Sequence, residues 1–222
     1  RHFEEHMNDD LDVKGAFDAT FVTISQLIRL MKEGWVSGMA LNGAGIIHDF
    51  EIALAGRTSE DVAARIKDGT FGTARETGHY LNRAIKEGAR RGLGLGEAVG
   101  QMMAAARFPY KHLSLLAASS GLGIPVTVHV AVGTDSIHFH PEARGEAIGK
   151  PSLQDFFLFC SLLEGLDGGG VYINVGSAVI LPEVFLKSHP TRFGSDVRMQ
   201  VFASTWAAHP TVAEERLARA LA

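Results

Sequence analysis

One segment, residues 39–51, joins an apolar strand pattern directly to a helical one through a turn of small residues. It reads Met-Ala-Leu-Asn-Gly-Ala-Gly-Ile-Ile-His-Asp-Phe-Glu. A strand that passes straight into a helix is the repeating unit of α/β folds with mostly parallel sheets. Small residues at such a turn let backbone N–H groups approach a phosphate, although the same turn suits an ordinary strand-to-helix connection. The segment therefore constrains the fold strongly and the function weakly.

Two further segments, 124–132 and 171–175, have the composition of strands. The first is rich in β-branched residues and ends in 133–135 (Gly-Thr-Asp), and the second ends in 176–177 (Gly-Ser). Strands that are apolar throughout and alternate with helices indicate a mostly parallel sheet with helices on both faces. The expected fold is α/β, and His129 is expected to be a core residue.

Helical periodicity predicts the elements between these strands. Helices are expected at 21–32, 49–55, 73–86, 98–106, 112–120, 152–163 and 211–221, with further strands at 36–41 and 199–202. The helix at 73–86 has a thin apolar face and is expected to face solvent or a second subunit. The helix at 152–163 is apolar nearly all round and is expected to be buried. The whole chain, 1–222, is expected to form a single domain with an N-terminal arm at 1–15.

Caps and glycines set the expected helix boundaries. Thr73 and Glu76 have the spacing of a capping box, and Ser152 is expected to cap the helix that follows it. The glycine-rich segment 92–96 is expected to be a flexible joint.

Composition narrows the classes of function. The chain carries a formal net charge of −4, which argues against a nucleic-acid surface, because such a surface needs clustered Lys and Arg. Cys160 is the only cysteine. We expect it in the core, and we expect the protein in a reducing cytoplasm. No apolar run reaches the roughly 18 residues that span a bilayer, so no membrane partner is expected.

Three of the expected strand ends carry residues that suit a nucleotide. In parallel sheets, ligands bind beyond the carboxyl ends of the strands. An acidic residue at one end suits ribose hydroxyls, and glycines at the others suit a pyrophosphate. The expected binding residues are Asn42, Gly43, Ala44, Gly45, Thr134, Asp135, Gly176 and Ser177.

Two of these strand ends lie within longer sequence segments. They are Asn-Gly-Ala-Gly-Ile-Ile-His-Asp-Phe-Glu at 42–51 and Asn-Val-Gly-Ser-Ala-Val-Ile-Leu-Pro-Glu-Val-Phe-Leu-Lys at 174–187. Both resemble phrases of the deoxyhypusine synthase family, and more specifically of a prokaryotic deoxyhypusine-synthase-like branch. The resemblance extends over about 21–187 and includes Thr134 and Asp135.

The resemblance implies a Rossmann-like fold that binds NAD and a homotetramer with sites at subunit interfaces. It also implies transfer of a 4-aminobutyl group from the polyamine spermidine to a lysine of a translation factor. In that chemistry NAD takes a hydride from spermidine, and a lysine holds the butyl group as an imine. Asp135 would accept a hydrogen bond from a ribose hydroxyl or hold the amine end of a polyamine.

The chain departs from the family pattern at several positions. Ile47 and His48 stand where the family has paired glutamates, and Pro182 stands where it has its catalytic histidine. No segment resembles the family's tryptophan-glycine-lysine nucleophile motif, and Lys150 and Lys187 are the nearest candidates. Transfer with altered or lost catalytic residues is therefore the first hypothesis. A catalytically inactive oligomeric binding module is the second.

Histidines near the strand ends are candidates for chemistry. His48 and His140 suit general acid–base catalysis, because an imidazole titrates near neutral pH. His138 and His140, with His48 and Asp135, would also make a workable zinc or iron set and indicate a metal-dependent hydrolase. Asp49 is the third catalytic candidate, although an acidic residue at a helix start also stabilises the helix dipole whatever its function.

Overall fold

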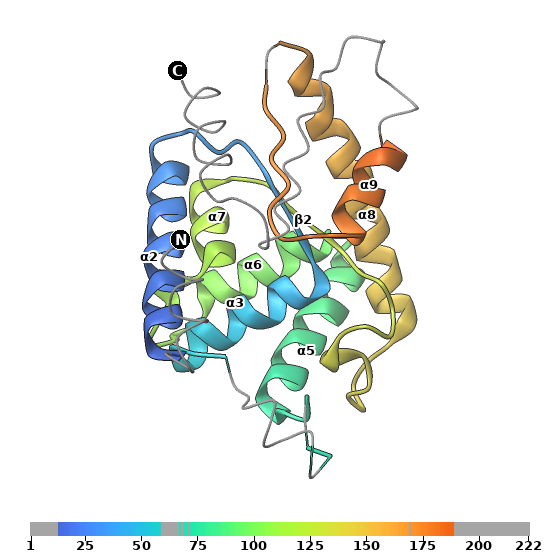
Figure 1. Ribbon diagram of the computed structural model, residues 1–222. Coiled ribbons are helices and arrows are strands. Elements are labelled where there is room, and N and C mark those ends of the chain that lie inside the picture. The colour runs from blue at the N-terminus through green and yellow to red at the C-terminus, as the bar shows by residue number, and fades with distance from the viewer. Residues whose placement is uncertain (1–12, 59–66, 68, 71, 169, 189–222) are drawn as a thin grey trace.

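The computed structural model describes residues 13–58, 67, 69–70, 72–168 and 170–188 (Figure 1). This part of the chain is mainly helical and contains a two-stranded parallel sheet, a mixed arrangement compatible with the α/β class. The strands are β1 (Met39–Asn42) and β2 (Val126–His129). The helices are α2 (Val13–Lys32), α3 (Gly43–Ala55), α5 (Arg75–Arg91), α6 (Leu95–Ala105), α7 (Leu115–Leu122), α8 (Gly145–Glu164) and α9 (Ile180–Ser188). The 3₁₀ turns are η1 (Lys111–Leu113), η2 (Ser136–His138) and η3 (Gly165–Gly168).

Some predicted elements lie outside the described residues. These are the first twelve residues of the expected arm, the strand at 199–202 and the helix at 211–221. Residues 13–15 of the arm belong to α2.

The two strands separate two hydrophobic clusters. Figure 1 shows α8 and α9 together on one side of the strands, with α2 and α7 on the other. The larger cluster, called the main core below, draws on α3, α5, α6, α7, β2, η2 and the start of α8. Its largest fully buried members include Phe50, Ile46, Leu81, Ile85, Leu95, Met103, Leu116, Val99 and Val128. The smaller one, the side cluster, consists of buried Phe159, Leu163 and Phe185 with Ala40 and Tyr172 packed against it. Helices thus cover both faces of the strand pair.

Alternation along the strands explains this division. Val126 and Val128 of β2 enter the main core. His129 points to the other face, because successive side chains of a strand alternate. It is 4% exposed and packs edge-on against Phe159 at a ring distance of 5.2 Å. The prediction that His129 is a core residue is confirmed, and burial lowers the pKa of His129 to about 4.

The helix α3 begins at Gly43, earlier than the predicted start at residue 49. Asn42 is its N-cap, and the Asn42 side-chain oxygen accepts a hydrogen bond from Gly45 N at 2.9 Å. The small residues of the turn are therefore the first turn of the helix. The prediction was wrong because glycine is a poor helix former, whereas here a side-chain cap at Asn42 supports the helix start. The predicted end is confirmed, since Gly56 closes α3 with φ +71°.

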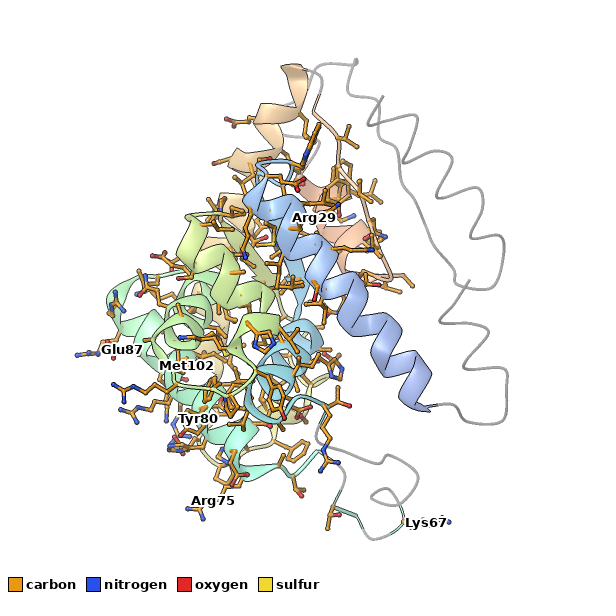
Figure 2. All side chains as sticks on the ribbon, turned by 90° about the vertical axis from the view of Figure 1, so that its left-hand side faces the viewer. Arg29, Lys67, Arg75, Tyr80, Glu87 and Met102 are labelled. Atoms are coloured by element: carbon orange, nitrogen blue, oxygen red, sulfur yellow. The ribbon has the colours of Figure 1, made fainter. Side chains whose placement is uncertain are left out.

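The helix α5 belongs to the main core, contrary to the expectation that it faces solvent or a second subunit. Leu81 and Ile85 are buried. Asn82 is also buried, and its side-chain amide donates to the carbonyl oxygens of Gly78 (2.9 Å) and Ile137 (3.0 Å). The buried face of α5 includes glycine and a polar residue whose hydrogen bonds are satisfied. A hydropathy pattern does not score these residues as apolar, so the face was predicted to be thin. Figure 2 shows the opposite face, with charged side chains projecting outward.

Two expected local features at the ends of α5 are not found. The Thr73 hydroxyl donates to the Thr70 carbonyl at 2.7 Å, and α5 has no side-chain N-cap bond, so the capping box is not formed. The glycine-rich segment after α5 is not a loose joint. Gly92 closes α5 with φ +73°, and a β-carbon on Gly96 would collide with the backbone carbonyl of Val126. Residue 96 is glycine because α6 packs directly on β2 at this point.

The helix α8 begins at Gly145 and continues through Pro151, so the prediction that Ser152 caps it was wrong. The Ser152 hydroxyl instead donates to the Val128 carbonyl at 3.1 Å and accepts from Val130 N at 3.2 Å. Ser152 therefore pairs with the free edge of β2. A cap and an edge partner use the same hydroxyl chemistry, and the sequence does not distinguish them.

The expectation that α8 is buried on all sides was also wrong. Phe159 and Leu163 are buried, but Leu153 is 55% exposed and Phe157 is 60% exposed. Cys160 is half-buried rather than a core residue. One apolar face of α8 packs inside the described part of the chain, and the other does not.

The segment 171–175 is extended but pairs with no strand in the described part of the chain, so the predicted third strand is wrong there. Its residues still alternate. Val171, Ile173 and Val175 are exposed, whereas Asn174 is buried and donates to the Ser177 carbonyl at 2.8 Å. The local sequence favours extended backbone, but a strand also needs a partner elsewhere in the chain.

Candidate functional site

The carboxyl ends of the two strands lie side by side. Asn42 at the end of β1 is the register partner of His129 at the end of β2. The chain after β2 returns through η2, and this return brings the Asp135 carboxylate to the start of α3. A β-carbon on Gly43 would collide with Asp135 Oδ2, so residue 43 must be glycine for this approach.

Asp135 is a buried carboxylate in a mixed electrostatic environment. Its side chain is 9% exposed. Burial raises the pKa of Asp135, while electrostatic interaction with the His138 ring, a hydrogen bond from the Thr134 hydroxyl (3.3 Å) and electrostatic interaction with His48 act to lower it. The nearby N-terminus of α3 also favours a negative charge. The exposed His48 is the predicted catalytic residue that lies within electrostatic reach of Asp135.

His138 sits in the turn beside this carboxylate. Its Nδ1 accepts hydrogen bonds from the backbone N–H groups of Gly133 (3.1 Å) and Asp135 (3.2 Å). A nitrogen that accepts carries no proton, so the proton of the neutral ring lies on Nε2. The Nε2 atom lies 3.8 Å from Asp135 Oδ2 and is buried without a hydrogen-bond partner among the described residues.

Asp49 lies away from this cluster and acts on another helix. Its carboxylate accepts from the Ser114 hydroxyl (2.6 Å), Leu115 N (2.7 Å) and Leu116 N (3.3 Å), and thereby caps the start of α7. Burial raises the pKa of Asp49, and these three hydrogen bonds oppose the rise. Asp49 is in the interior of α3 and not at its start, so the dipole argument applies to α7 instead.

His140 is likewise engaged elsewhere. Its ring lies against Gly78 of α5, where a β-carbon would collide with it, and its Nδ1 accepts from Glu142 N at 3.2 Å. Within the described ranges, no group of three or more His, Cys, Asp or Glu side chains is arranged to hold a metal ion. The metal-dependent hydrolase built on His138, His140, His48 and Asp135 therefore finds no support in the geometry.

Gly176 and Ser177 form a local turn. Gly176 has φ +73°, and the Ser177 hydroxyl accepts from Leu181 N at 3.1 Å in the first turn of α9. The described contacts do not join this turn to Asp135. The two candidate lysines also lie on the surface: Lys150 is exposed, and Lys187 pairs with Glu183 at 3.5 Å.

Sequence analysis missed the fully buried Asp155 of α8. Its Oδ2 accepts from Gly96 N (2.9 Å) and Val128 N (2.7 Å), which ties α8 to the start of α6 and to β2. Burial raises the pKa of Asp155 to about 6, although the backbone hydrogen bonds oppose this. The signal was present in the sequence, since Asp155 is the single acid in the segment 152–163 and lies four residues before Phe159, on the same face of the helix.

The start of α3 suits the ribose of a dinucleotide but not its pyrophosphate. The Asp135 carboxylate is an acceptor that suits a ribose hydroxyl or a cationic amine. A pyrophosphate placed against Gly43 would meet that carboxylate, and like charges repel. The donor and acceptor set at this strand edge therefore fits a hydroxyl-bearing or amine group.

Comparison of the chain with known protein families, curated proteins and solved structures finds no match. None of the described helices is both long and apolar enough to cross a membrane.

Proposed function

We propose that this chain is a deoxyhypusine-synthase-like, NAD-binding protein and an NAD-dependent aminobutyl-type transferase that acts on a polyamine. The observation that carries the proposal is the Asp135 carboxylate, which lies against Gly43 at the carboxyl edge of a parallel strand pair. That edge is where ligands bind in α/β sheets. The resemblance of 42–51 and 174–187 to the family supports the choice of cofactor.

The proposed roles follow the placement of the residues. Asp135 and Thr134 would meet a ribose hydroxyl, with Asn42, Gly43, Ala44 and Gly45 forming the helix start beneath it. NAD, when bound, would supply the hydride acceptor for amine oxidation. His48 is exposed near Asp135 and would move the proton of the amine. The proposal also includes a Rossmann-like extension of the sheet, with Gly176 and Ser177 in the site. It further includes a homotetramer, a protein lysine as the acceptor and a cytoplasmic location.

A second candidate, a catalytically inactive oligomeric binding module, is favoured by different observations. Pro182 replaces the family's histidine, and Lys187 is paired on the surface. Asp49 and His140 already make structural contacts. A chain that has kept the fold and lost the chemistry would have these properties.

Calorimetric titration of NAD into wild-type protein and Asp135→Ala tests the proposal. We expect micromolar binding by wild type and a loss of at least about ten-fold in the variant, because a charge-assisted hydrogen bond is removed. Glu146→Ala, which removes an exposed acid at the start of α8, is the matched control and should bind like wild type. Folded wild-type protein that does not bind NAD would favour the binding module.

Spermidine-dependent formation of NADH separates the two candidates further. We expect NADH to form when spermidine and NAD are both present. His48→Ala should lower the rate by about 10²-fold or more while NAD affinity stays unchanged, because a general base contributes to the chemical step and not to cofactor binding. If the protein binds NAD but forms no NADH with spermidine, the proposed cofactor site stands and the proposed transfer reaction is contradicted.

A further inference from the structure

We propose that His138, in its neutral form with the proton on Nε2, is a positioning residue that holds Asp135 in its acceptor position at the start of α3. This inference rests on the proposed function, because it takes Asp135 as the group that meets the ligand. The sequence indicates His138 only as a possible metal ligand, whereas its hydrogen bonds in the structure indicate a different role.

Nδ1 of His138 is a hydrogen-bond acceptor for the loop that carries Asp135. The loop between β2 and η2 makes a tight return, and two of its backbone N–H groups, those of Gly133 and Asp135, point at this one atom. Gly133 has φ +99°, a backbone conformation that favours glycine. Without an acceptor at this point the two N–H groups would have no protein partner among these contacts, and the return that carries Asp135 would lose two of the hydrogen bonds that shape it.

Nε2 of His138 faces the Asp135 carboxylate. The His138 side chain is only 7% exposed, and its N–H donor has no partner in the part of the chain that the structure describes. An unpaired buried donor is costly and calls for an explanation. Asp135 Oδ2 lies 3.8 Å away, beyond hydrogen-bond distance but close enough for the donor's positive end to stabilise an ionised carboxylate. The unpaired Nε2–H group therefore stabilises the ionised carboxylate of Asp135.

The turn that carries His138 is anchored in the main core. Ile137, its neighbour in η2, is 2% exposed in the main core, and the Ile137 carbonyl accepts from Asn82 of α5 at 3.0 Å. Asp135 and His138 also form a reciprocal capping box across the turn. A ring on so firmly anchored a turn can fix the position of a neighbouring carboxylate, as a positioning residue must.

Two replacements of His138 separate its two nitrogens. His138→Asn places an amide oxygen where Nδ1 lies, and that oxygen can accept from both N–H groups. His138→Gln carries its polar group to the Nε2 position and leaves the N–H groups of Gly133 and Asp135 unpaired. We expect NAD affinity to stay within about threefold of wild type in the Asn variant and to fall about ten-fold or more in the Gln variant.

Calorimetry of NAD binding, with thermal midpoints to confirm folding, gives clear outcomes. Equal losses in both variants, or no loss in either, would overturn the role of His138, while binding by wild type and its loss in Asp135→Ala would leave the proposed function intact. Failure of folded wild-type protein to bind NAD would overturn the proposed function and this inference together.

A measurement on wild type alone tests the inference without any ligand. In ¹⁵N-resolved spectra of the histidine rings, the signals missing from His138→Asn identify His138. We expect a protonated Nε2 and an unprotonated Nδ1 in the neutral ring. A proton on Nδ1 would overturn the inference whatever the result with NAD.

Discussion

The main core and the side cluster differ in how completely the described chain covers them. In the main core, Phe50, Leu81 and Val128 have no exposed surface. The side cluster is small, and apolar side chains such as Phe157 and Val175 on the neighbouring elements are 60% and 69% exposed. One face of the strand pair thus has a closed core, whereas the other has an incomplete one. Most of the stabilisation by apolar burial must come from the first face.

The comparison is tested most strongly by shortening one phenylalanine in each cluster. Phe50 is fully buried and edge-on to Phe108 at 5.5 Å, and Phe185 is stacked on Tyr172 at 4.4 Å. We expect Phe50→Ala to lower the free energy of unfolding by about 4 kcal/mol and Phe185→Ala by about 2 kcal/mol, because an open cluster relaxes around a cavity more easily. Urea denaturation measures both, and equal losses would contradict the difference between the clusters.

The link between the two regions is tested by the pH dependence of Asp155. Burial raises its pKa to about 6 from an ordinary value of 3.8, so the native protein holds this proton more tightly than the unfolded chain does. Its contribution to stability is therefore present below the unfolded pKa and is lost as the pH rises through about 6. Relative to Asp155→Asn, wild type should lose about 3 kcal/mol of unfolding free energy between about pH 4 and pH 7.

Asp155→Asn is a matched variant because its amide oxygen can still accept from Gly96 N and Val128 N. Denaturant titrations at several pH values give the two curves. Parallel curves would show that Asp155 does not titrate in this range, and the account of its burial would be wrong.

The same glycine-to-alanine change should have opposite effects on stability at a closely packed glycine and at an open one. A β-carbon on Gly96 in α6 would collide with the Val126 carbonyl, whereas one on Gly149 in α8 would meet no atom within 4 Å. We expect Gly96→Ala to cost about 2 kcal/mol through overpacking. Gly149→Ala should stabilise by about 0.5–1 kcal/mol through helix propensity. Thermal melting compares them, and destabilisation by Gly149→Ala would indicate a partner on that face of α8.

The smallest expected effect belongs to the exposed face of α8. Phe157 is 60% exposed, and Phe159, on the same helix, is 4% exposed. Phe157→Ser should change the free energy of unfolding by less than about 0.5 kcal/mol, as is usual for surface positions. Phe159→Ser is the matched buried variant and should be strongly destabilising. A large loss from Phe157→Ser would mean that this face is covered in solution.

Much of the fold could be predicted because its local signals are strong. Six of the described helices overlap segments where periodicity predicts a helix, and the strand predictions at 36–41 and 124–132 overlap β1 and β2. The failures have a common cause in long-range packing. The face of α5 is buried through Asn82 and glycine, and segment 171–175 has strand composition without a strand partner in the described residues. Neither property depends on local sequence alone.

The candidate site could be predicted only in part, for the same reason. That Gly43 and Asp135 approach one another follows from the rule that parallel strands end at one edge, and the structure places them together. The role of Asp49 depends on α7. Its three hydrogen-bond partners there are 65 to 67 residues further along the chain. The role of His138 depends on which of its nitrogens faces two backbone N–H groups, and only coordinates reveal that.

The carboxylate of Asp155 also has a consequence for the order in which the molecule assembles. The helix α6 has no side-chain cap of its own, and the acceptor for Gly96 N comes from a residue 59 positions later. While the chain is being synthesised, α6 emerges before the group that finishes it, and its first turn stays incomplete until α8 has docked. An interaction that is absent from the folding transition state raises the barrier to unfolding more than it speeds folding, and we expect this contact to be one of them. The first turn of α6 is thus completed by Asp155, a residue that is synthesised later than the helix itself.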